Sequence, residues 1–134
     1  TSERRSWNMS RIKGRNTGPE LRLRSLLHRA GFRFRLHPKD LPGKPDIVLS
    51  RYRTVIFVHG CFWHQHPRCR NATTPSTRRD FWQAKFDENV SRDARNCADL
   101  QSAGWNVITV WECELKADAE SVVGRISEQL RKDG

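Results

Sequence analysis

The stretch PDIVLSRYRTVIFVHG, residues 45–60, decides the fold. It holds two short runs of aliphatic and β-branched residues with one aromatic, at 47–49 and 55–58, and a polar segment between them at 50–54. Residues of this kind favour strands, and a short polar connection favours antiparallel pairing. The sequence therefore predicts a β-hairpin whose second strand, an uninterrupted apolar run, is buried.

Helical patterns flank this hairpin. On the N-terminal side, Thr17 has the character of an N-cap, Pro19 falls in the first turn, and leucines recur at helical spacing up to Gly31. On the C-terminal side, apolar residues recur at near-helical spacing over 81–104. We expect an amphipathic helix in each place.

The remaining segments complete a single α/β domain of 134 residues. Residues 32–36 alternate as a half-exposed strand would, 105–111 read as another core strand, and apolar positions over 122–130 mark a closing helix. This order predicts a mixed central sheet flanked by helices. It is the order of a restriction-endonuclease-like core, although order alone does not establish chemistry.

The charge of the chain favours a polyanionic partner. Lys and Arg number 25 against 15 for Asp and Glu, a formal net charge of +10, and basic residues crowd an arm at 1–15 that we expect to contact DNA. The plainer alternative is that the charge serves solubility alone. The sequence has no apolar run of about 18 residues and no signal segment at its start, so we expect a cytoplasmic protein without a membrane partner.

Cysteine and histidine residues form a candidate structural zinc site. Three thiols and one imidazole suit a closed tetrahedral set: Cys61, His66, Cys69 and Cys113. Spacing alone leaves His64 as a competitor for His66, and buried free thiols are the alternative reading. We interpret Cys97, on the apolar face of the long predicted helix, as a core cysteine outside this site.

Acidic and histidine residues form a candidate catalytic set for DNA hydrolysis, which needs a divalent cation and a base for water. Asp46 enters the first hairpin strand after Pro-Gly-rich sequence, and pairing of the hairpin is expected to bring His59 and His64 towards it. Asp93 stands where the long helix should be apolar, so we expect a histidine partner for it. Glu20 fits either a capping box or an active-site acid.

Five segments, in order along the chain, resemble the signature segments of the very short patch repair (Vsr) endonucleases: LPGKPD at 41–46, VHGCFWH at 58–64, FW at 81–82, NVSRD at 89–93, and the stretch from GW through WEC at 104–113. The resemblance covers nearly the whole chain from Met9 onward. It implies an endonuclease that nicks double-stranded DNA on the 5′ side of the thymine in a T·G mismatch.

The same resemblance implies roles for individual residues. Asp46 would hold Mg²⁺ together with the backbone carbonyl of Val58, and His64 would activate water while Asp93 orients it. His59 would assist at the phosphate or leaving group, and Glu20 matches an active-site acid. The implied zinc ligands are those of the spacing argument, with His66 preferred to His64: Cys61, His66, Cys69 and Cys113.

The resemblance also implies a wedge for DNA. Phe62 and Trp63 would enter the base stack beside the mismatch, and Met9 of the basic arm would insert from the opposite groove. Such insertion costs a few kcal/mol per step and less at a mismatch, which makes deformability a source of selectivity. Core packing is the alternative for Phe62 and Trp63.

Two other functions stay open at this point. One is a restriction-type or other-mismatch nuclease on the same fold, and the other is a zinc-stabilised DNA-binding module without catalysis. A one-strand nick and the small size favour a monomer. Assistance from a MutL-type mismatch-repair protein is a further open question.

Overall fold

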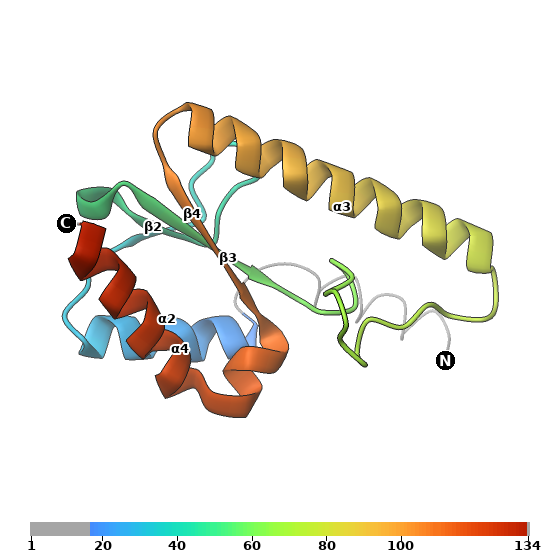
Figure 1. The fold of residues 1–134 in the computed structure, drawn as a ribbon, viewed down its shortest axis with the longest axis horizontal. Helices are drawn as coiled ribbons and strands as arrows, with labels where there is room; N and C mark the ends of the chain where they lie inside the picture. Colours follow the sequence, from blue (N-terminus) through green and yellow to red (C-terminus); the bar gives the residue numbers. More distant parts are fainter. Residues whose placement is uncertain (1–16, 134) are drawn as a thin grey trace.

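The computed structural model describes residues 17–133, so the whole arm at 1–15, Met9 included, lies outside the described residues. One mixed sheet of four strands, in the order β1-β2-β3-β4, forms the centre (Figure 1). Neighbours pair antiparallel except β3 and β4, which are parallel. The strands are β1 (Arg35–Leu36), β2 (Ile47–Leu49), β3 (Thr54–His59) and β4 (Asn106–Trp111).

The predicted hairpin is confirmed as β2 and β3, joined by a single 3₁₀ turn, η1 (Ser50–Tyr52). The alternating segment at 32–36 forms a strand only at its last two residues. Phe32 is instead buried in the core, where its ring meets Tyr52 edge-on at 5.7 Å. The sheet edge is therefore shorter than the alternation predicted.

Among the described residues, three helices cover the sheet: α2 (Gly18–Arg29), α3 (Arg79–Ser102) and α4 (Glu112–Asp133). Thr17 caps α2 as predicted, because its hydroxyl accepts the N–H of Glu20 at 3.4 Å. Gly104, at φ +92°, follows the end of α3. The closing helix begins directly after β4, ten residues before the predicted apolar positions, and bends at Asp118, where φ is −162°.

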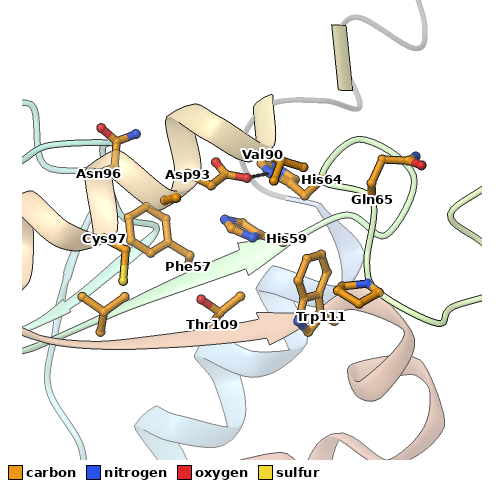
Figure 2. Close-up of a pocket in the computed structure, with 13 residues that line it drawn as sticks. Phe57, His59, His64, Gln65, Val90, Asp93, Asn96, Cys97, Thr109 and Trp111 are labelled. Atoms are coloured by element: carbon orange, nitrogen blue, oxygen red, sulfur yellow. Dashed lines mark hydrogen bonds and ion pairs between the residues drawn. The ribbon is translucent and has the colours of Figure 1, made fainter. Parts of the chain in front are cut away.

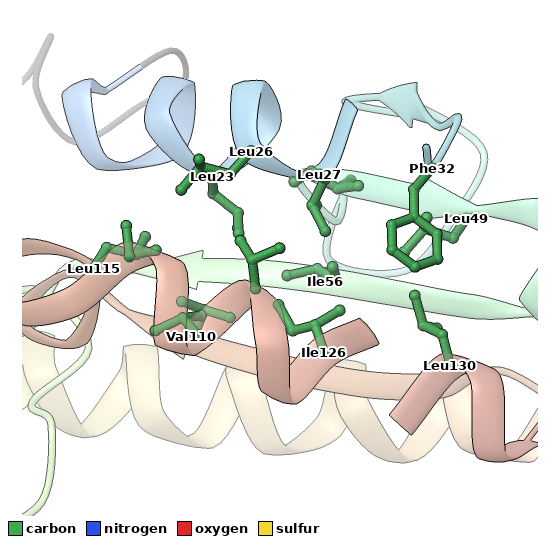
Figure 3. Close-up of a cluster of buried hydrophobic side chains, with 14 residues drawn as sticks. Leu23, Leu26, Leu27, Phe32, Leu49, Ile56, Val110, Leu115, Ile126 and Leu130 are labelled. Atoms are coloured by element: carbon green, nitrogen blue, oxygen red, sulfur yellow. The ribbon is translucent and has the colours of Figure 1, made fainter. Parts of the chain in front are cut away.

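Different helices pack on the two faces of the sheet. On one face, α2 and α4 enclose the larger apolar core, seen in Figure 3 with Leu27 and Ile126 facing Ile56 from the two helices. On the other face lie α3 and a smaller core of Val48, Val55 and Leu100. Successive residues of β3 therefore point alternately to the two layers. This alternation decides which candidate side chains can meet.

Candidate active site and metal centre

Within residues 17–133, three groups of His, Cys, Asp and Glu residues each bring their potential ligand atoms within 4.8 Å of one another. We call them the acidic cluster (Glu20, His37, Asp46), the histidine cluster (His59, His64, Asp93) and the thiol cluster (Cys61, His66, Cys69, Cys113). The last residue of β3, His59, pairs in register with the last residue of β4, Trp111. The histidine and thiol clusters gather around this end of the parallel pair.

The acidic cluster depends on the point where β2 begins. The Asp46 N–H donates to the Ile56 carbonyl at 3.1 Å, and its carboxylate Oδ2 accepts the Val58 N–H at 2.7 Å. In the register of the hairpin, Asp46 lies one step beyond the Ile47–Ile56 pair, and its side chain rather than a backbone carbonyl accepts the Val58 N–H. Burial, and secondarily the nearby Glu20 carboxyl, raise the pKa of Asp46 to about 7, although the Val58 hydrogen bond opposes this rise.

Glu20 contributes to this cluster from the first turn of α2. Its backbone takes part in the helix cap, whereas its side chain, in a residue only 1% exposed, lies 3.0 Å from Arg24 and 3.2 Å from the His37 ring. The Thr17 half of a capping box is therefore present, whereas the Glu20 carboxylate faces Arg24 and His37 in the acidic cluster.

His37 is the member that the sequence analysis missed. Its backbone N–H donates to the Asp46 carbonyl at 3.2 Å, and its ring Nδ1 lies 3.9 Å from Asp46 Oδ1. The residue has φ +46°, in the left-handed region, so the strand pattern around it could not place its ring.

The histidine cluster lies on the α3 side of the sheet (Figure 2). His64 Nδ1 meets Asp93 Oδ2 at 2.6 Å, which supplies the histidine partner expected for Asp93. The His59 ring stacks on His64 with centroids 3.8 Å apart and planes within 4°. Burial lowers the pKa of His59 to about 4, and the neighbouring His64 adds to this effect, so His59 is neutral at pH 7.

The hairpin was predicted to bring His59 and His64 towards Asp46, but Asp46 lies in a different cluster from these two histidines. Val58 packs towards the core under α2 and α4, so His59, the next residue on β3, points to the opposite layer. The connection to Asp46 runs through the backbone, because Asp46 accepts the N–H of Val58, one residue before His59. The acidic and histidine clusters thus flank the same strand end from two sides.

The thiol cluster joins the loop after β3 to the start of α4. His66 Nδ1 lies 3.7 Å from the Cys61 sulfur and 3.4 Å from the Cys113 sulfur, and Cys69 completes the group. Burial raises the pKa of the Cys61 thiol to about 12, which favours the protonated form unless a cation is bound. Three sulfurs and one nitrogen fit a tetrahedral zinc ion. His64 belongs instead to the histidine cluster.

Aromatic rings connect these clusters. The Trp111 indole stacks on His66 with centroids 4.1 Å apart and meets His59 edge-on at 5.3 Å. The rings of His64, His59, Trp111 and His66 therefore form one continuous series. Nothing in the sequence pattern indicated this role for Trp111, which was expected only as the end of a core strand.

Phe62 and Trp63 lie on the loop between the histidine and thiol ligands. Both side chains are half-buried, and they pack against rings of α3, with Phe62 5.1 Å from Phe86 and Trp63 6.0 Å from Trp82. Asn89 of α3 donates to the Trp63 carbonyl at 3.2 Å. The loop is thus held against the long helix while part of each ring stays open.

A cavity of about 310 Å³ opens between α3 and the sheet (Figure 2). His59, His64 and Asp93 line it together with apolar side chains of β3, β4 and α3. Cys97, which we expected in the core, is only half-buried and lines this cavity. It lies apart from the thiol cluster.

Known proteins resemble this chain in sequence over most of its length. Residues 1–70 match the family model described as DNA mismatch endonuclease Vsr. The chain belongs to the Vsr family. It is 50% identical over 129 residues to the type II nicking enzyme V.XorIIP of Xanthomonas oryzae, covering 96% of this chain and 90% of that protein. The DNA mismatch endonuclease Vsr of Escherichia coli is 45% identical over 128 residues, covering 96% and 81%.

A solved structure agrees on the fold. The catalytic domain of the homing endonuclease I-Bth0305I superposes with a TM-score of 0.62 at 21% identity, over 88% of this chain and 98% of that chain. The predicted nuclease-like α/β fold with a mixed sheet between helices is therefore confirmed. As a member of the Vsr family, the protein is a DNA endonuclease, a hydrolase of phosphodiester bonds. In the described part of the chain, no helix is long and apolar enough to cross a membrane.

Proposed function

We propose that this Vsr-family endonuclease nicks double-stranded DNA on the 5′ side of the thymine in a T·G mismatch, by Mg²⁺-dependent hydrolysis. The observation that carries the proposal is the pairing of an acidic cluster with a His64–Asp93 pair across the end of β3. A cation site and a positioned base are the two requirements of metal-assisted phosphodiester hydrolysis. The name of the Escherichia coli relative, a mismatch endonuclease, supports the substrate.

The acidic cluster fits the cation. The carboxylates of Asp46 and Glu20 and the carbonyl of Val58 offer oxygen atoms, which Mg²⁺ prefers. When bound there, Mg²⁺ supplies positive charge that offsets the charge developing on the scissile phosphate. The Val58 N–H holds Asp46 Oδ2 in place, which leaves Oδ1 to face the cluster.

The histidine cluster contains side chains suited to the proton transfers of phosphodiester hydrolysis. Asp93 accepts a hydrogen bond from His64 Nδ1, so the remaining nitrogen Nε2 is the basic one and can take a proton from water. His59 is neutral at pH 7, and a neutral imidazole can donate a hydrogen bond to a phosphate oxygen without carrying charge. Its stacking on His64 holds the two rings parallel and 3.8 Å apart, so each limits the rotation of the other.

Mismatch selection is assigned to the aromatic loop. Phe62 and Trp63 would enter the base stack beside the T·G pair, with Met9 of the arm opposite, and less free energy is needed to unstack a mismatch than a matched pair. The thiol cluster begins at Cys61, one residue before this wedge, and a zinc ion there would make the loop rigid.

The proposed substrate indicates the cellular location and the oligomeric state of the enzyme. We place the enzyme in the bacterial cytoplasm, acting on chromosomal DNA as a monomeric single domain, since one strand is cut at an asymmetric pair. The relatives compared here are bacterial proteins. A MutL-type partner is a separate question, which pull-down with purified MutL would answer.

A second candidate is a nicking enzyme with a different mismatch or sequence specificity, because the Xanthomonas oryzae relative is named as a type II nicking enzyme. The discriminating experiment uses end-labelled duplexes that differ only in carrying T·G or C·G within CT(A/T)GG or within other palindromes. A nick confined to the thymine strand of the mismatch supports the proposal. Equal cutting of both duplexes would favour the second candidate, and binding without cutting would favour a non-catalytic module.

A further inference from the structure

His37 faces the two carboxylates of the acidic cluster. Its ring lies 3.2 Å from Glu20 through Nε2 and 3.9 Å from Asp46 through Nδ1. The side chains are well enclosed, with 12% of His37, 2% of Glu20 and 18% of Asp46 exposed. One imidazole and two carboxylates therefore converge on a small volume that water reaches poorly.

The backbone fixes this convergence. His37 donates its N–H to the Asp46 carbonyl, and its positive φ of +46° turns the chain sharply after β1. An unusual backbone conformation held by a specific hydrogen bond is typical of a positioned functional residue. The ring is thus presented to Asp46 and Glu20 from the strand that neighbours Asp46.

The distances fit a shared cation. Two ligand atoms about 2.2 Å from one cation and at right angles to each other lie about 3.1 Å apart. The separation of 3.2 Å between His37 Nε2 and Glu20 Oε2 is close to that value, and all three ligand atoms lie within 4.8 Å. Small adjustments of side chains would bring one ion within reach of all three.

We propose that His37 is a ligand in this site and that, with Glu20 and Asp46, it makes the site prefer Mn²⁺ and other first-row transition ions to Mg²⁺. The inference rests on the proposed cation site of the nuclease and adds to it a donor that the sequence did not reveal. Imidazole suits transition ions, whereas Mg²⁺ favours oxygen ligands and retains its waters.

The charge of the ligands and the type of donor atom make separate contributions to cation affinity at this site. Arg24 contacts the same Glu20 oxygen at 3.0 Å and offsets part of its negative charge, so Coulombic attraction alone is reduced. The coordinate bond from a nitrogen donor then contributes a larger share of the affinity.

The test is Mn²⁺ binding to the full-length, zinc-loaded protein without DNA, followed by electron paramagnetic resonance. Pulsed measurements of nitrogen coupling report a nitrogen bonded directly to the manganese ion, so wild type itself provides the first readout. His37→Gln and His37→Asn should lose this coupling and weaken Mn²⁺ binding by about 10-fold or more, with a smaller preference for Mn²⁺ over Mg²⁺. His28→Gln, an exposed histidine of α2, is the matched control and should match wild type.

Two outcomes overturn the proposal. Bound Mn²⁺ without nitrogen coupling in wild type shows that His37 is not a ligand, and its ring is then a charge partner of the carboxylates only. Coupling that persists in both His37 variants assigns the nitrogen to another histidine. Neither measurement involves DNA, so failure of the mismatch proposal would show separately, as equal cutting of T·G and C·G duplexes.

Discussion

Replacing Asp46 by Asn should stabilise the protein while abolishing its activity. Burial and the neighbouring Glu20 carboxyl hold the pKa of Asp46 near 7, so ionisation of this carboxyl costs free energy in the folded state. Asn resembles the protonated form and removes that cost. It also leaves only a neutral oxygen for a cation, so Mg²⁺-dependent nicking should be lost.

The magnitude follows from the pKa. A rise from 3.8 to about 7 corresponds to roughly 4 kcal/mol, because each tenfold change in proton affinity is worth about 1.4 kcal/mol. The favourable Val58 hydrogen bond to the ionised carboxylate is already included in this pKa, and Asn still accepts the Val58 N–H as the protonated acid would. We expect a gain of about 3–4 kcal/mol at pH 8 in the absence of Mg²⁺, which is roughly 9–16 °C in Tm.

The pH dependence has a definite sign. Between pH 4 and 7 the folded state keeps a proton on Asp46 that the unfolded state has released, so this carboxyl contributes less stability as pH rises. The difference in unfolding free energy between Asp46→Asn and wild type should therefore be near zero at pH 4, grow to pH 7 and stay constant above it. Subtracting the unfolding free energy of wild type from that of the variant cancels the pH-dependent contributions of the other ionisable groups, including His59.

Urea unfolding of the zinc-loaded protein, measured from pH 4 to 8.5 without Mg²⁺, is the assay. Asp99→Asn, an exposed acid of α3, is the matched control and should leave stability nearly unchanged. Added Mg²⁺ should raise the Tm of wild type and not that of Asp46→Asn. A variant less stable than wild type at pH 8, or a difference that does not change with pH, would refute the reasoning.

Three further predictions concern other parts of the molecule. Asp93→Asn should keep the Tm within about 2 °C and retain DNA affinity but lower the single-turnover nicking rate by about 10²- to 10⁴-fold, because His64, the proposed base, loses its anionic partner. Cys113→Ser, or removal of zinc by a chelator, should abolish cooperative unfolding monitored by circular dichroism, since the thiol cluster joins β3 to α4. Gly43→Ala should cost about 1–3 kcal/mol in urea unfolding, because its φ is +73° and the new methyl group would lie 2.8 Å from Asn96, whereas Gly124→Ala in open helical surroundings should stabilise by about 0.5–1 kcal/mol.

Each of these predictions can fail visibly. Nicking at the wild-type rate in Asp93→Asn would remove the His–Asp pair from the mechanism. Cooperative unfolding with the wild-type midpoint after zinc removal would show that the thiol cluster holds no structural ion. Equal stability of the two glycine variants would show that the loop at 38–46 adapts freely to α3.

Local sequence patterns were sufficient for most of the fold. The apolar runs of the hairpin, the cap at Thr17 and the stop at Gly104 are short-range signals, and the structure has all three. The bend at Asp118 has a local cause, because its carboxylate accepts the Ser121 N–H at 3.1 Å and so caps the second part of α4, whereas the early start of α4 follows the end of β4 directly. Periodicity of apolar residues carries no information about either.

The site residues also divide into those that local sequence patterns predict and those that depend on the three-dimensional arrangement. The pairing of Asp93 with His64 was predictable because an acid on an apolar helical stripe needs a partner. The separation of Asp46 from the two histidines depends on the face alternation of β3, which requires the register of the hairpin. His37 was beyond sequence reasoning, since a left-handed backbone conformation at a histidine leaves no recognisable pattern.

The series of rings from His64 through His59 and Trp111 to His66 has a consequence for evolution and engineering. Because Trp111 contacts the His59 ring on one side and the His66 ring on the other, a change in either neighbour alters the packing available to the second. Substitutions in the histidine cluster and in the thiol cluster should therefore be non-additive, and a different set of residues in the thiol cluster would still have to pack against the Trp111 indole. An engineer who exchanges one of these two clusters should therefore exchange both.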